Sequence, residues 1–214
     1  MGNEVIKDSR VLYSKVVSVL FHPLFMPVYG LAIILSANSP FGFLPFNVKR
    51  LLFLIFVVNN VFLPISLLPF LMQMNFINSW TLEEREERAV PMIVTTILYA
   101  TTSYIVYRLP VPHFLKTFIF ATFLLSLIVT IINFRWKISL HSVGIGALIA
   151  TILYLAFNMH APLGWYLIGA FIAAGMVLSA RLRLSLHNPP QVWSGFFTGL
   201  AGMTLLIMLL QQLT

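Results

Sequence analysis

The sequence has no cysteine among its 214 residues, so it can form no disulfide, no thiolate metal site and no cysteine nucleophile. Charged residues are also scarce, at 9% of the chain against about 25% in a soluble domain. Only six residues are acidic, and Asp8 is the only aspartate. A chain that is 59% hydrophobic cannot cover its surface with polar groups in water. These absences predict an integral membrane protein.

Seven apolar runs approach the roughly 20 residues that a transmembrane helix needs. They cover roughly residues 17–38, 51–74, 89–107, 114–133, 141–158, 163–182 and 191–212. We expect an all-α bundle of transmembrane helices, with a polar N-terminal tail at 1–16 and one membrane domain at 17–214. Pro23 and Pro27 predict a kinked or re-entrant first run, which leaves six or seven full spans.

Polar residues gather in three clusters beside the apolar runs. The stretches are TLEEREERAVP with Arg85 and Arg88, FRWKISLHS with Ser139 and His141, and SARLRLSLHNPP with Arg181 and His187. Two predicted helices separate each cluster from the next, and an even number of crossings returns the chain to the same face. The three clusters are therefore predicted to lie on one side of the membrane.

Arginines, a serine and two histidines on one face are typical of a phosphate site. The planar guanidinium group binds phosphate oxygens through charge-assisted hydrogen bonds, and hydroxyl groups add donors. One histidine can attack phosphorus while another protonates the departing oxygen.

The net charge of +7 suits an anionic lipid or phosphate ligand and gives no reason to expect nucleic acid. No metal or cofactor is expected, because the histidines lack ligand spacing and the carboxylates gather in one loop.

The third cluster resembles the signature of the type 2 phosphatidic acid phosphatase superfamily, S-R-x5-H-x3-D followed by a glycine-containing helix. Here Ala180 and Arg181 are followed by five residues, then His187, then three residues, then Gln191. The following VWSGFFTG is similar to the family's continuation, and its Gly195 predicts close helix packing.

The other two clusters resemble the family's remaining motifs in the same order. Ser139-Leu140-His141 is similar to P-S-G-H, without its proline and glycine, and Arg85, Arg88 and Pro91 are loosely similar to K-x6-R-P. The resemblance covers about residues 50–212. It implies a helical lipid phosphatase that works without metal.

The resemblance also implies a role for each matching residue. His187 would be the nucleophile that forms a phosphohistidine, and His141 would be the general acid for the leaving group. The residues that would hold the phosphate are Arg181, Ser139 and one or both of Arg85 and Arg88. In the family an aspartate orients the nucleophile, and Gln191 stands in its place here.

Gln191 can hold a histidine tautomer through its carbonyl oxygen but cannot balance an imidazolium charge. Loss of the orienting acid costs about 10⁴ in rate in a serine protease triad. A glutamate among residues 83–87 would compensate for the missing aspartate if it supported His187.

A simpler structural interpretation stands beside each of these roles. Arg181 would be an interfacial anchor, Ser139 a helix N-cap, and Arg85 and Arg88 parts of a surface ion-pair loop. His22 and His113 are interpreted as structural residues.

The sequence leaves the function open among three classes. The first is a phosphatase of a bacterial inner membrane that acts on a polyprenyl diphosphate, phosphatidylglycerol phosphate, phosphatidate or lipid A phosphate. The second is a non-catalytic protein that binds an anionic lipid or serves as a subunit of a membrane complex. The third is a lipid or anion transporter, which the lack of acidic residues within the spans disfavours.

Overall fold

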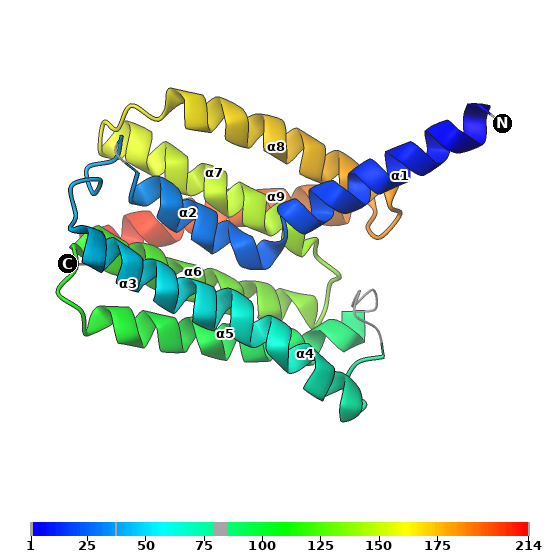
Figure 1. The fold of residues 1–214 in the computed structure, drawn as a ribbon, viewed down its shortest axis with the longest axis horizontal. Coiled ribbons are helices and arrows are strands. Elements are labelled where there is room, and N and C mark those ends of the chain that lie inside the picture. The colour runs from blue at the N-terminus through cyan, green and yellow to red at the C-terminus, as the bar shows by residue number, and fades with distance from the viewer. Residues whose placement is uncertain (1, 37, 79–84, 214) are drawn as a thin grey trace.

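The computed structural model describes residues 2–36, 38–78 and 85–213, and over these ranges it contains helices and their connections but no strand. The elements are α1 (Gly2–Leu20), the 3₁₀ turn η1 (Pro23–Phe25), α2 (Met26–Ile34), α3 (Phe46–Val57), the π-helical turn η2 (Val58–Phe62), α4 (Leu63–Gln73), α5 (Arg85–Tyr107), α6 (His113–Asn133), α7 (Leu140–Asn158), α8 (Gly164–Arg183) and α9 (Pro189–Gln212). Figure 1 shows these helices as one elongated bundle, from which α1 projects.

Within the described residues, seven helical segments are long and apolar enough to cross a membrane. The prediction of an all-α polytopic bundle is therefore confirmed, and the chain is an integral membrane protein. The first segment begins earlier than predicted, at Ser9 rather than near residue 17. Most of the segment predicted as a polar tail, residues 1–16, belongs to α1, in which apolar Val11 and Val16 alternate with polar residues.

The first membrane segment is broken where the sequence predicts a kink. Pro23 has no backbone N–H, so it cannot continue the α-helical hydrogen-bond ladder. The amide of His22 instead donates to the carbonyl of Val19 at 3.2 Å, and η1 follows before α2 resumes. The chain then continues across, so Ser9–Ile34 forms one interrupted span.

The second span contains a π-helical turn for a related reason. Pro64 withholds the N–H that the carbonyl of Asn60 would accept in an α-helix, and the ladder widens to η2 just before it. The buried side chain of Asn60 accepts a hydrogen bond from Thr102 Oγ1 at 2.7 Å, which ties η2 to α5. This turn directs α4 along the α5 side of the bundle.

Helix α7 lies at the centre of the bundle and packs most closely on α9. A Cβ atom placed on Gly199 would lie 2.0 Å from the carbonyl oxygen of Val143, and one on Gly146 would lie 2.3 Å from that of Phe196. Only glycine allows the two backbones to approach this closely, which confirms the predicted glycine packing. Helix α7 also packs on α8, α2 and η1, while α5 and α6 form a second pair that joins α9 through α6.

The three polar clusters lie at the same end of the bundle, as the count of crossings predicts. The start of α5, the connection from α6 to α7 and the connection from α8 to α9 all reach this end (Figure 1). Arg85 there donates to the carbonyl of Arg135 at 3.2 Å, so the first and second clusters are in contact. We call this end of the molecule the site end.

Candidate functional site

A cavity of about 440 Å³ extends into the bundle from the site end. It lies between η1 and α2 on one side and α5 and α6 on the other, with α4 and α7 completing its walls. Its lining is mostly apolar and includes Leu24, Met26, Leu68 and Met92. The cavity reaches from Arg88 to Tyr99 along α5, about three helical turns or roughly 16 Å. These dimensions suit a hydrocarbon chain rather than a small polar molecule.

The polar lining of the cavity gathers cationic and imidazole groups from different elements. Arg88 of α5, Arg181 of α8 and His187 of the α8–α9 connection all line it, although their relative exposures are only 6%, 6% and 7%. Burial, together with the positive charges of Arg88 and Arg181, lowers the pKa of His187 from 6.5 to about 4. His187 is therefore a neutral imidazole at neutral pH, the form in which a ring nitrogen can act as a nucleophile.

Gln191 contacts His187 at the position where the resembling family has an aspartate that orients the histidine. Its Oε1 lies 3.2 Å from His187 Nδ1 and also accepts the backbone N–H of Asn188 at 3.2 Å. Because a backbone N–H can only donate, the oxygen of the Gln191 amide must face these two groups. Nδ1 of His187 then carries the proton, and Nε2 carries the lone pair.

The local sequence explains why Gln191 is so placed. Asn188 is the N-cap of α9, and Pro189 follows at the first helical position, where a missing N–H costs nothing. The side chain of Asn188 accepts from the backbone of Gln191 at 3.0 Å, and Gln191 returns the bond, which makes a capping box. A helix start therefore holds the tautomer of His187.

His141 lies in the first turn of α7 and is fixed by a contact from α1. Its Nε2 lies 3.0 Å from the backbone carbonyl of Ser18. A carbonyl can only accept, so Nε2 carries a proton, and Nδ1 is left to hold or transfer another. His141 also lines the cavity, together with His187.

Two residues predicted to bind phosphate lie outside the cavity lining. Ser139 is fully buried, is the N-cap of α7 and hydrogen-bonds Ser142 Oγ at 2.9 Å. Arg85 has a side chain that is 38% exposed and forms an ion pair with Glu86 at 2.6 Å. The structure therefore places Arg88 and Arg181 at the cavity, and it places Ser139 and Arg85 elsewhere.

The glutamates proposed to support His187 divide into two groups. Glu86 pairs with Arg85, and Glu87 accepts from the side chain of Asn78 at 2.7 Å. Glu83 and Glu84 lie outside the described residues.

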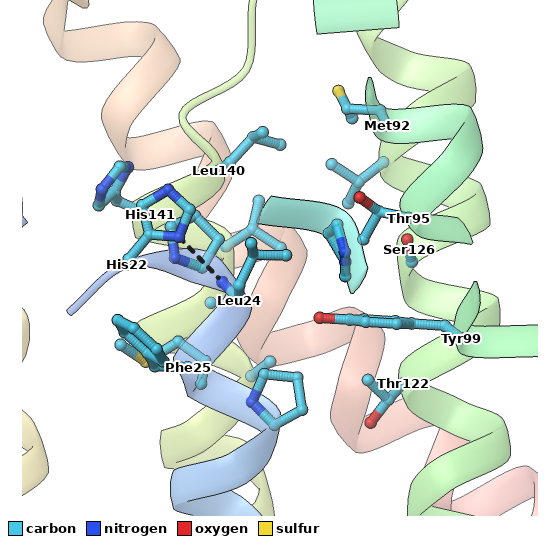
Figure 2. A pocket seen from close by; sticks show the side chains of 18 of the residues that line it. His22, Leu24, Phe25, Met92, Thr95, Tyr99, Thr122, Ser126, Leu140 and His141 are labelled. Atoms are coloured by element: carbon cyan, nitrogen blue, oxygen red, sulfur yellow. Dashed lines mark hydrogen bonds between the residues drawn. The ribbon is translucent and has the colours of Figure 1, made fainter. Parts of the chain in front are cut away.

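The structure adds cavity-lining polar residues that the sequence did not single out as site residues. His22 lines the cavity, and its ring lies 5.4 Å from that of His141 in an edge-to-face arrangement. Tyr99 points its hydroxyl across the cavity from α5, on the same wall as Thr95 and Ser126 (Figure 2). The sequence did contain one indication of a role for His22, because an ionisable residue inside a membrane span is by default a candidate functional residue.

Within residues 2–36, 38–78 and 85–213, no three histidine or carboxylate side chains group closely enough to hold a metal ion. The groups that converge are arginines and imidazoles, whose charges and N–H donors suit an anion better than a cation. The fold and this cavity thus define a polytopic helical membrane protein with an apolar cavity and a cationic, histidine-bearing lining. No protein-family model, curated protein or solved structure matches the chain.

Proposed function

We propose that the protein is a lipid phosphatase that removes phosphate from a lipid phosphate or diphosphate through a phosphohistidine. The observation that carries this proposal is that one cavity has both apolar walls and a lining of arginines and histidines. Apolar walls receive the hydrocarbon chain, while Arg88, Arg181 and the two histidines His141 and His187 face the phosphate. Both features are needed for a ligand with an anionic head and an apolar tail.

In the first step Nε2 of His187 attacks phosphorus, and a bond forms between them. The bond from phosphorus to the lipid oxygen breaks, and its electron pair remains on that oxygen. His141, when protonated, gives the proton of Nδ1 to the oxygen, while its Nε2–H stays on the Ser18 carbonyl. Arg88 and Arg181 stabilise the negative charge on the transferring group.

In the second step water attacks the phosphohistidine. Nδ1 of His141 accepts a proton from that water, and the bond from phosphorus to Nε2 of His187 breaks. Its electron pair returns to the ring, so both histidines regain their starting states and inorganic phosphate leaves.

The resemblance supports the fold and setting that this proposal assumes. The order of the clusters and their two-helix separation are similar to those of the type 2 phosphatidic acid phosphatases. A bacterial inner membrane is the setting that fits a lipid phosphate substrate of this kind.

The experiment is phosphate release by the purified protein, in EDTA, from a panel of lipid phosphates and diphosphates. We expect release by the wild type and none by His187→Ala. The matched control is His113→Ala, because His113 is exposed at the other end of α6. An acid-labile phosphorylated intermediate in the wild type alone would identify the covalent step.

A second candidate function rests on Gln191. A neutral amide orients His187 but cannot stabilise an imidazolium, so the same cavity also suits a non-catalytic protein that binds an anionic lipid. Lipid binding without any phosphate release would select this function and reject the phosphatase.

A further inference from the structure

The break between α1 and α2 brings a fourth segment of the chain to the site. This segment, Ser18–His22, lies outside the part of the sequence that carries the resemblance. Ser18 contacts both His141 and Arg181, and His22 lines the cavity beside His141.

The break makes the carbonyl of Ser18 available. In a continuous helix this carbonyl would accept the N–H of His22, four residues later. Here the N–H of His22 donates to Val19 instead, because Pro23 ends the helix. Nε2 of His141 donates to the carbonyl of Ser18 in its place, at 3.0 Å. An unused backbone acceptor thus fixes the orientation of the proposed general acid.

The hydroxyl of Ser18 makes a second connection. It accepts a hydrogen bond from Nη1 of Arg181 at 3.3 Å and donates to the carbonyl of Ser14 at 2.9 Å. The hydroxyl therefore uses its proton and one of its two lone pairs. Ser18 holds the guanidinium of Arg181 through one atom and the ring of His141 through another.

The ring of His22 lines the cavity and carries one hydrogen-bond donor. Its Nδ1 accepts the backbone N–H of Leu24 at 3.4 Å, which caps η1. A backbone N–H can only donate, so Nδ1 holds a lone pair and the proton of the neutral ring is on Nε2. The two ring nitrogens point in largely opposite directions, so Nε2–H is directed away from Leu24. Figure 2 shows His22 beside His141, with its bond to Leu24 dashed.

We propose that Ser18–His22 is a fourth part of the phosphate site, in which His22 donates its Nε2–H to a phosphate oxygen and Ser18 positions His141 and Arg181. This proposal rests on the proposed function for the class of ligand, a lipid phosphate. His22 supplies the neutral donor that Ser139 was expected to supply, since Ser139 is used as a buried helix cap.

Two substitutions of His22 separate its roles. His22→Asn keeps an acceptor near the position of Nδ1, and asparagine is a preferred N-cap, so the start of η1 is retained while the Nε2–H donor is lost. His22→Gln places an amide N–H near the position of Nε2 and loses the cap. We expect His22→Asn to weaken binding of a short-chain diacylglycerol phosphate about ten- to a hundredfold, as for a lost hydrogen bond to a charged group. His22→Gln should retain most of the affinity.

Binding is measured by calorimetric titration of the purified protein, with the uncharged diacylglycerol as the ligand control. Thermal unfolding without ligand is recorded for each variant, because a purely structural His22 would change this midpoint and not the affinity. Equal affinity of wild type and His22→Asn, or no binding of the lipid phosphate by the wild type, would overturn the proposal. Since no turnover is required, absence of phosphate release with weakened binding by His22→Asn would reject the phosphatase and leave this proposal standing.

Ser18 has its own matched set of variants. Ser18→Ala removes the hydroxyl bond to Arg181 and should weaken binding about two- to tenfold, while Ser18→Thr keeps a hydroxyl and should restore it. Ser14→Ala, one turn earlier on the same helix, should leave binding unchanged, because the Ser14 hydroxyl donates to the carbonyl of Arg10 at 3.0 Å and the Ser14 carbonyl that Ser18 uses is retained. Equal losses in Ser18→Ala and Ser14→Ala would contradict a positioning role for Ser18.

Discussion

The two ends of the bundle carry the same kinds of residue in opposite environments. At the site end, Arg88 and Arg181 are buried and line a cavity with three histidines. At the other end, Arg108 and Lys116 lie on the surface over tyrosine rings, 5.3 Å and 5.4 Å from the ring centres. At the site end the positive charges lie beside an apolar cavity, and at the other end they lie over tyrosine rings near solvent.

Burial, rather than the number of cations, distinguishes the end at which we propose that the ligand binds. A buried positive charge in a membrane protein is expensive and is retained where it pairs with a ligand or partner. A surface arginine over a tyrosine needs no ligand to account for it. A substitution at the site end should therefore change ligand affinity more than the same substitution at the other end, while both leave the fold intact.

The largest expected effect is the loss of phosphate affinity in Arg181→Gln. This change removes a charge-assisted hydrogen bond, so the dissociation constant of a lipid phosphate should rise about ten- to a hundredfold. Arg108→Gln, the same substitution at the other end, should change it less than about twofold. Titration of both variants with one lipid phosphate measures the contrast, and equal effects at the two ends would contradict it.

A somewhat smaller effect is expected from Gln191→Met, which preserves length but removes the acceptor for His187. Without the 3.2 Å contact, Nδ1 no longer fixes the tautomer of the ring. We expect kcat to fall about two- to tenfold with KM nearly unchanged, as for the loss of one neutral hydrogen bond and far less than the factor of about 10⁴ for an orienting aspartate. Steady-state kinetics on the best lipid substrate give both constants. A rise in KM with kcat intact would place Gln191 in ligand binding instead.

A pH effect on stability should arise at the site end. The folded protein lowers the pKa of His187 from 6.5 to about 4, so between these values the unfolded chain binds a proton that the folded chain does not. The contribution of His187 to stability is therefore present above pH 6.5 and is lost as pH falls toward 4. The unfolding temperature of His187→Gln should fall less steeply over this window than that of the wild type. If the unfolding temperatures of the two proteins changed in parallel with pH, the folded protein would not lower the pKa of His187.

The smallest effect is expected from Lys116→Gln at the other end. This substitution removes the cation–π contact between half-buried Lys116 and the exposed ring of Tyr107, worth about 0.5–1 kcal/mol at most. Thermal unfolding should shift slightly, and binding of lipid phosphate should not change. A loss of binding as large as that of Arg181→Gln would remove the distinction between the two ends.

The helices were predictable because each span must satisfy its own backbone within lipid and present apolar side chains to it. Hydropathy alone thus predicted seven segments, and Pro23 predicted the break in the first. The start of α1 was predicted too late, because its N-terminal part is amphipathic rather than uniformly apolar. Hydrogen bonds between near neighbours in the chain, such as the capping box of Asn188 and Gln191, also depend on local sequence.

The site was less predictable, since it depends on which side chains face inward. Arg85 and Arg88 are three residues apart at the start of α5, yet Arg85 forms a surface ion pair and Arg88 lines the cavity. At the start of α7, His141 lines the cavity, whereas Ser139, two residues earlier, is a buried N-cap outside the lining. The sequence led us to interpret His22 as structural, and only the fold places it in the cavity lining beside His141.

The sequence by itself determined the membrane class, a count of six or seven spans and the gathering of the polar clusters at one end of the bundle, because hydropathy and crossing parity are properties of the chain alone. Only the tertiary structure decided which of those polar groups share a cavity and that Ser18 and His22 join them. These facts depend on helix rotation and on contacts between residues far apart in the chain, such as Ser18 and Arg181, which no local pattern records.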